Sequence, residues 1–150
     1  MTRELLLPDA AATEAIGRRL ALVLRAGDVV TLSGGLGAGK TSLARGVLAE
    51  LGLPGEAPSP TFAIVQPYAP PEVRLPVLHV DLYRIDDPAE LEELGLDEAR
   101  LDSALLVEWP DRAAGRWPDA LALSLTPTPD GARRLTWDGP AAWEARWRPT

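Results

Sequence analysis

Two stretches of the chain carry apolar residues at the spacing of an α-helix. The first group consists of Ile16, Leu20, Val23 and Leu24; Asp9 or Thr13 can cap its start and Gly27 supplies a stop. The second group consists of Leu43, Val47, Leu48 and Leu51, in a segment that runs from about Thr41 to Gly52. A third, short helix is predicted to begin at Asp87-Pro88-Ala89-Glu90, which combines an acidic cap with a proline at the first helical position, and to end at Gly95.

Runs of aliphatic and β-branched residues predict six strands between and after these helices. They cover residues 29–34, 61–68, 77–84, 104–109, 120–125 and 132–137, separated by loops rich in proline and glycine. Trp143 and Trp147 close the chain without a predicted element. A helix–strand–helix order followed by several strands predicts an α/β fold, with a mixed sheet flanked by helices. We find no repeat and no linker, so residues 1–150 are expected to form a single domain.

Composition removes several classes of protein. The chain has no cysteine, which excludes disulfides, thiolate metal sites and cysteine nucleophiles. No run approaches the ~18–20 apolar residues of a membrane span, and Glu4, Asp9 and Glu14 interrupt any signal peptide. The net charge of −7 argues against direct, high-affinity binding of nucleic acid. We therefore expect a cytoplasmic protein that neither enters a membrane nor binds nucleic acid tightly by itself.

Acidic residues gather in one segment. Eight of the 22 acids lie between residues 86 and 102, where Arg100 is the one base. A solvated helical face is the favoured interpretation, and a docking site for a basic partner is the alternative.

Some residue types are so rare in this chain that the few that occur are candidates for a functional role. The chain has 14 arginines but a single lysine, Lys40; His79 is the single histidine, and asparagine is absent. A GC-rich coding bias or a thermophilic source would both give this composition. Under either bias, a rare residue that persists is expected to be needed, and Lys40 and His79 both fall in the segments discussed next.

Residues 34–41 read GGLGAGKT and match the pattern G-x-x-x-x-G-K-[ST] between a predicted strand and a predicted helix. Glycines let successive backbone N–H groups turn toward phosphate oxygens, and the helix N-terminus adds its partial positive charge. Lys40 is expected to be an exposed charge that reaches the β/γ-phosphates, and the Thr41 hydroxyl is expected to bind Mg²⁺. A glycine-rich turn without a ligand is the alternative, but it leaves the single lysine unexplained.

Two acidic residues occupy positions in the sequence where the predicted phosphate loop would need a ligand for Mg²⁺. Asp81 follows one apolar strand and Glu108 follows another. In an α/β sheet such positions lie near the edge where nucleotides bind, although a surface acid at a strand end is the plainer interpretation of each. The motif Asn-Lys-x-Asp that reads guanine is impossible here, since asparagine is absent and the lysine is already used. ATP with Mg²⁺ is therefore the expected ligand.

Taken together, these segments resemble the bacterial TsaE family, also called YjeE. The resemblance rests on the phosphate loop, on SPTF at residues 59–62, on HVDLYR at 79–84, on a short acidic helix ending near Gly95, and on VEWP at 107–110. It covers roughly residues 7–111 and fades after Pro118. The family implies a P-loop ATPase needed for making threonylcarbamoyladenosine on tRNA, working with a heterodimer of TsaD and TsaB.

The resemblance also implies roles for individual residues. The nucleotide-binding set would be Leu36, Gly37, Ala38, Gly39, Lys40, Thr41 and Ser42. Thr41 and Glu108 would serve Mg²⁺, together with a catalytically important Asp81. Thr61 resembles a switch residue that senses the γ-phosphate. Ala10 would lie by the base and Asp111 near the nucleotide, both on position alone.

Several residues and functions keep a second interpretation. His79 is favoured as a buried, hydrogen-bonded strand residue over a proton shuttle. Trp109 suits the core, the mouth of the site or a partner interface, whereas Trp137, Trp143 and Trp147 suit packing. Arg133 and Arg134 are favoured as a solvated pair over a phosphate contact. Besides a partner-dependent ATPase, the chain could be a small-molecule kinase with Arg112 and Arg116 in its lid, or a nucleotide-gated binding module with negligible turnover.

Overall fold

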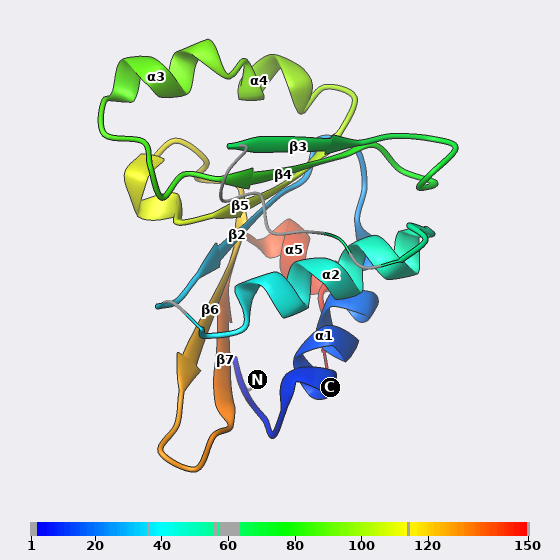
Figure 1. Cartoon of the computed structure of the whole chain (residues 1–150), viewed down its shortest axis with the longest axis vertical. Coiled ribbons are helices and arrows are strands. Elements are labelled where there is room, and N and C mark those ends of the chain that lie inside the picture. Colours follow the sequence, from blue (N-terminus) through cyan, green and yellow to red (C-terminus); the bar gives the residue numbers. More distant parts are fainter. Residues whose placement is uncertain (1–2, 36, 56, 58–63, 114, 150) are drawn as a thin grey trace.

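The computed structural model describes residues 3–35, 37–55, 57, 64–113 and 115–149. A single sheet of seven strands forms its centre, in the order β1-β7-β6-β2-β5-β4-β3 (Figure 1). The strands are β1 (Glu4–Leu7), β2 (Val29–Ser33), β3 (Val65–Tyr68), β4 (Val77–Asp81), β5 (Ala104–Glu108), β6 (Leu121–Pro127) and β7 (Arg133–Asp138). The helices are α1 (Ala10–Val23), α2 (Lys40–Leu51), α3 (Pro88–Glu93), α4 (Leu96–Ala99) and α5 (Ala141–Arg146), with a 3₁₀ turn, η1 (Pro110–Ala113).

The predicted α/β fold with a mixed sheet is confirmed. The four central strands, β6, β2, β5 and β4, run parallel, and β1, β7 and β3 add antiparallel edges. Besides the 3₁₀ turn η1, two helices and one strand were not predicted. Both α4 and α5 are too short to show a helical period, and β1 is an edge strand of four residues without clear alternation.

Four of the six predicted strands lie within two residues of their predicted bounds, and the other two differ by three or more. Residues 61–63 of the predicted strand 61–68 lie outside the described residues, and β3 begins at Val65. The strand predicted over 77–84 ends at Asp81. It ends there because the Asp81 carboxylate accepts a hydrogen bond from the backbone N–H of Tyr83, at 2.9 Å, and this contact turns the chain.

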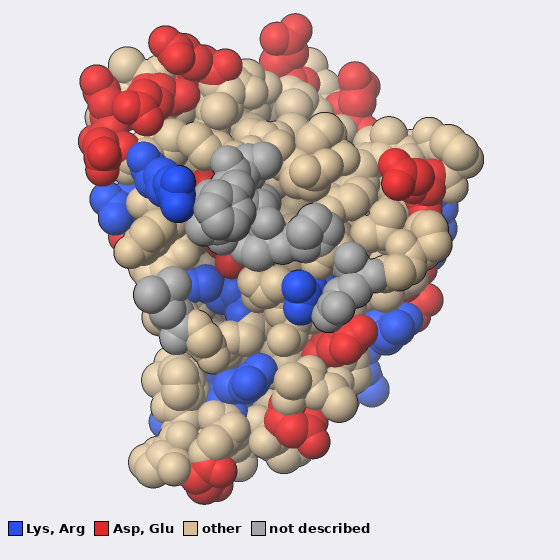
Figure 2. All heavy atoms as spheres, viewed as in Figure 1, with Lys and Arg blue, Asp and Glu red and all other residues tan. Residues whose placement is uncertain are grey.

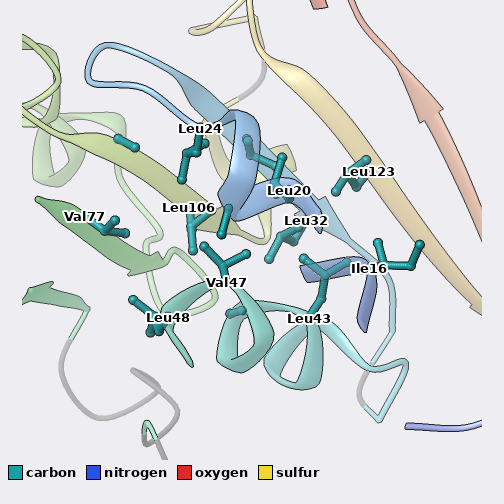
Figure 3. Close-up of a cluster of buried hydrophobic side chains, with 14 of the residues drawn as sticks. Ile16, Leu20, Leu24, Leu32, Leu43, Val47, Leu48, Val77, Leu106 and Leu123 are labelled. Atoms are coloured by element: carbon teal, nitrogen blue, oxygen red, sulfur yellow. The ribbon is translucent and has the colours of Figure 1, made fainter. Parts of the chain in front are cut away.

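Helices α1 and α2 lie side by side on one face of the sheet, over the larger of two apolar cores (Figures 1 and 3). Close helix packing depends on two glycines. A Cβ on Gly17 would lie 2.0 Å from the Leu43 carbonyl oxygen, and one on Gly46 would lie 2.0 Å from the Glu14 carbonyl oxygen. This packing fixes α2, and with it the loop at its N-terminus, against the carboxyl ends of the parallel strands.

The opposite face carries a second core under α3, α4 and η1. All eight acids of residues 86–102 are exposed, as a solvated face predicts, and Figure 2 shows acidic atoms gathered over α3 and α4. Arg116, in the segment that follows η1, ties that segment to both helices, because its guanidinium pairs with Glu92 at 2.6 Å and Asp97 at 2.9 Å. Within the described ranges, no helix is long and apolar enough to cross a membrane.

Candidate functional site

A pocket of about 310 Å³ opens at the carboxyl edge of the parallel strands. Its lining comes from the loop between β2 and α2, from the ends of β4 and β5, and from β7. The lining residues are Gly37, Ala38, Gly39, Lys40, Thr41, Ser42, Asp81, Glu108, Trp109 and Arg133. Segments that lie far apart in the sequence therefore meet at one site, and most of the residues singled out from the sequence are among them.

The loop that enters α2 is shaped to expose backbone donors. Gly39 caps the helix in the left-handed conformation, with a φ of 107°, and makes no side-chain capping hydrogen bond. The first amides of α2 therefore receive no side-chain cap within the described part of the chain, and the helix N-terminus offers a partial positive charge to an anion. A side chain at position 39 would be strained because of this left-handed backbone, and its Cβ would lie 2.7 Å from Nη1 of Arg133, so the end of that flexible side chain would have to move.

Lys40 is buried, not the exposed charge that the sequence predicted. Its residue is 6% exposed, and its Nζ donates to the carbonyl oxygens of Gly34 and Gly35 in its own loop. The ammonium also lies 3.9 Å from the centroid of the Trp109 ring, a cation–π contact. Burial lowers the pKa of Lys40, while the carboxylates of Glu108, Asp81 and Asp111 oppose that shift. The three carboxylates thus favour the charged form of Lys40 at the phosphate loop, against the effect of burial.

Asp81 and Glu108 are adjacent in the register of β4 and β5, at the ends of both strands. Both are buried, at 5% and 3% exposure. The two carboxylates and the Thr41 hydroxyl line the same pocket and supply oxygen donors only, which is the ligand type that Mg²⁺ prefers. Among the described residues no group of three or more His, Cys, Asp or Glu could hold a metal alone.

Trp109 lies at the mouth of this pocket. Its φ of 59° is left-handed, which is rare for a bulky residue and turns the chain immediately after Glu108. The ring packs on Tyr83, with 4.8 Å between the ring centroids, and on the Lys40 ammonium. Of the interpretations left open for Trp109, the structure supports the mouth of the site.

Arg133 and Arg134 do not form the solvated pair that the sequence predicted, because Arg133 lines the pocket. Arg134 is a surface residue that pairs with Glu4 at 2.5 Å, as predicted for a solvated pair. Arg133 instead lines the pocket, and its Nη1 donates to the Thr13 hydroxyl at 3.4 Å. Neighbouring residues of a strand point to opposite faces. The predicted strand 132–137 therefore contained the signal that the two arginines differ, but not which one faces the site.

Four residues of the predicted set are not placed in the pocket. Leu36 and Thr61 lie outside the described residues. Ala10 begins α1, is exposed and does not line the pocket. Asp111 lines a neighbouring hollow with Arg112, although its charge still acts on Lys40.

The strand–loop–helix geometry and the lysine, hydroxyl and carboxylates around it define a P-loop NTPase-like protein. The chain belongs to the TsaE family. The family model described as threonylcarbamoyl adenosine biosynthesis protein TsaE matches residues 7–135.

Individual relatives agree with this assignment. A tRNA threonylcarbamoyladenosine biosynthesis protein TsaE from Streptomyces coelicolor is 50% identical over 95 residues, covering 63% of this chain and 64% of that protein. One from Bacillus subtilis is 38% identical over 126 residues, covering 83% of this chain and 77% of that protein. The match to the Streptomyces protein thus spans slightly less than two thirds of its length.

A solved structure shares the fold. The crystal structure of Bacillus subtilis YdiB superposes with a TM-score of 0.78 at 28% identity, covering 95% of this chain and 88% of that one. The family match ends at residue 135, so the resemblance first seen in motifs up to residue 111 extends through β6 and the first half of β7.

Proposed function

We propose that this protein binds ATP with Mg²⁺ and hydrolyses it slowly, as the ATPase of tRNA threonylcarbamoyladenosine formation, with a TsaD–TsaB heterodimer as its partner. The observation that carries the proposal is the meeting of Lys40, Thr41, Asp81 and Glu108 around one pocket at the N-terminus of α2. The names of the relatives support the pathway.

Each lining group has a distinct task in this proposal. Loop amides and the uncapped start of α2 bind the phosphate oxygens. Lys40 exchanges its contacts with the Gly34 and Gly35 carbonyls for contacts with the β- and γ-phosphates. The Thr41 hydroxyl and Glu108 hold Mg²⁺, which neutralises charge on the phosphates when it is bound. Asp81, the register partner of Glu108 on β4, orients the attacking water or completes the metal site.

A small-molecule kinase is the second candidate, and the structure weakens its basis. Of the two arginines proposed for a lid, Arg116 already pairs with Glu92 and Asp97. A nucleotide-gated binding module is the third. The three are separated by whether ATP loss matches phosphate release, matches a phosphorylated acceptor, or is absent until a partner is added.

We predict that the isolated protein hydrolyses ATP slowly, well under one turnover per second. P-loop enzymes without an arginine finger in place turn over at about 10⁻⁴–10⁻³ s⁻¹, and Lys40 and Arg133 are the two basic residues that line this pocket in the described part of the chain. Continuous phosphate release from the purified chain measures the rate. Many turnovers per second without any partner would contradict the proposal and favour a self-contained enzyme.

Arg133 gives a second prediction, with a control on the same strand. Arg133→Met should raise the dissociation constant for ATP about tenfold, because a charge-assisted hydrogen bond is worth about 1.5–3 kcal/mol and this side chain is partly solvated. Arg134→Met removes the same charge from the outer face, where it pairs with Glu4, and should change ATP affinity less than about twofold. Calorimetric titration of both variants tests the pair. Equal effects would show that Arg133 acts only through the overall charge.

A further inference from the structure

His79, the single histidine of the chain, contacts Glu108, the proposed magnesium ligand. The Nε2 atom of His79 is 2.6 Å from Oε2 of Glu108, and the side chains of both residues are almost completely buried. His79 is on β4, two residues before Asp81, and its register partner on β5 is Leu106, two residues before Glu108. Residues two apart on a strand share a face, so the imidazole lies on the side of the sheet that faces α2 and the phosphate loop.

The second ring nitrogen of His79, Nδ1, is buried and has no hydrogen-bond partner among the described residues. A polar group buried without full compensation costs free energy, and an aliphatic side chain at this core position would avoid that cost. The contact with Glu108 is therefore what accounts for a histidine here, and a general packing role does not.

From this geometry we infer that His79 is a positioning residue that orients the Glu108 carboxylate toward Mg²⁺. An ionised carboxylate can only accept, so Nε2–H donates and Oε2 is held. The second oxygen, Oε1, is then the one left for a ligand in the pocket that Glu108 lines. His79 itself does not line that pocket, so it acts through Glu108 and does not touch nucleotide. The inference rests on the proposed function, because it presumes that Glu108 serves the metal.

A role of this kind has a specific consequence. Partners that orient metal ligands typically change metal affinity by about 10- to 100-fold when they are removed. The loss should appear in the Mg²⁺-dependent part of nucleotide binding. Binding of the triphosphate without metal depends on the loop amides and Lys40, which His79 does not contact, and should stay unchanged.

The experiment measures the Mg²⁺ coupling ratio, defined as the dissociation constant of a non-hydrolysable ATP analogue in EDTA divided by that in saturating Mg²⁺. Calorimetry gives both values for the full chain and its variants. We expect His79→Leu to lower the ratio about tenfold or more, with the EDTA value within about twofold of the parent. His79→Gln keeps an amide donor near the position of Nε2 and should restore most of the ratio. In a Glu108→Ala background, His79→Leu should change the ratio no further.

Three outcomes would overturn the inference. A parent-like ratio in His79→Leu, with both dissociation constants also parent-like, would show that the contact does not serve the metal. Equal loss in the EDTA and Mg²⁺ values, without rescue by His79→Gln, would show a role in folding only. An unchanged effect of His79→Leu in the Glu108→Ala background would show that it does not act through Glu108. If His79→Leu does not fold, as judged by circular dichroism, His79→Met replaces it. A parent protein that binds no analogue, or whose ratio is one, refutes the proposed function itself.

Discussion

Replacing Lys40 with alanine is expected to lower the affinity for ATP by about 10- to 100-fold and to abolish most hydrolysis. The range follows from the 1.5–3 kcal/mol that a hydrogen bond to a charged group contributes. In the structure the ammonium is held over the phosphate loop by two carbonyls, by the Trp109 ring and by the field of nearby carboxylates. Its loss removes the main cation from that loop. Calorimetric titration with ATP measures the effect directly.

Because Lys40 is buried, the variant needs a stability control. Alanine leaves the Gly34 and Gly35 carbonyls without this donor, so we expect a modest fall in melting temperature and an intact fold. Lys40→Arg should also fail to bind normally, since a planar guanidinium does not replace a compact ammonium in a space closed by a ring 3.9 Å away. Unchanged ATP affinity in Lys40→Ala, with the fold intact, would refute the assignment of the phosphate loop.

Replacing Glu108 with glutamine is expected to lower the rate of hydrolysis about 100-fold or more, which is the usual size of a lost acid–base or metal-ligand contribution. Binding of ATP in EDTA should weaken by less than about tenfold, because the loop amides and Lys40 still hold the triphosphate, whereas binding in saturating Mg²⁺ should weaken at least as much as in His79→Leu, by about tenfold or more. The amide keeps the shape of the side chain in its buried position but loses the charge and the basicity. Phosphate release and ATP affinity, each across a Mg²⁺ titration, separate the two effects.

Asp81→Asn is the matched control for this variant. The two acids are register partners and both are buried, so the substitutions remove one charge each from the same edge of the sheet. Both should fail in tRNA modification with the partners present, and Glu108→Gln should show the stronger Mg²⁺ dependence. If Glu108→Gln hydrolyses ATP at the parent rate with the parent's Mg²⁺ dependence, Asp81 carries the metal site instead.

The parts of the site that follow from local chemistry could be predicted from the sequence. The glycine spacing and the single lysine identify the phosphate loop, since few other structures need that pattern. Strand ends identify Asp81 and Glu108, because parallel strands bring their carboxyl ends to one edge. The central strands β2, β4, β5 and β6 were also predictable, since continuous apolar runs are typical of buried parallel strands.

Other features depend on contacts between distant segments. Arg133 enters the pocket because the β6–β7 hairpin runs beside β2, and no local pattern gives that pairing or which face Arg133 occupies. Lys40 is buried partly by Trp109, which lies 69 positions further along the chain. Trp109 has a left-handed backbone conformation, which could not be predicted from its residue type. His79 was predicted to be a buried, hydrogen-bonded strand residue, and the structure confirms that. Its hydrogen-bond partner, Glu108, could not be predicted from the sequence, because the contact depends on the register in which β4 and β5 pair.

The central claim, a partner-dependent ATPase of tRNA modification, is tested most directly by phosphate release from ATP with and without the TsaD–TsaB heterodimer, with threonylcarbamoyladenosine on tRNA followed in the same reactions. The proposal predicts slow release from the isolated chain, faster release when the heterodimer is added, and loss of both the stimulation and sustained tRNA modification in Lys40→Ala and Glu108→Gln. The proposal would be contradicted if the rate of phosphate release did not change when the heterodimer is added, or if both variants still sustained tRNA modification.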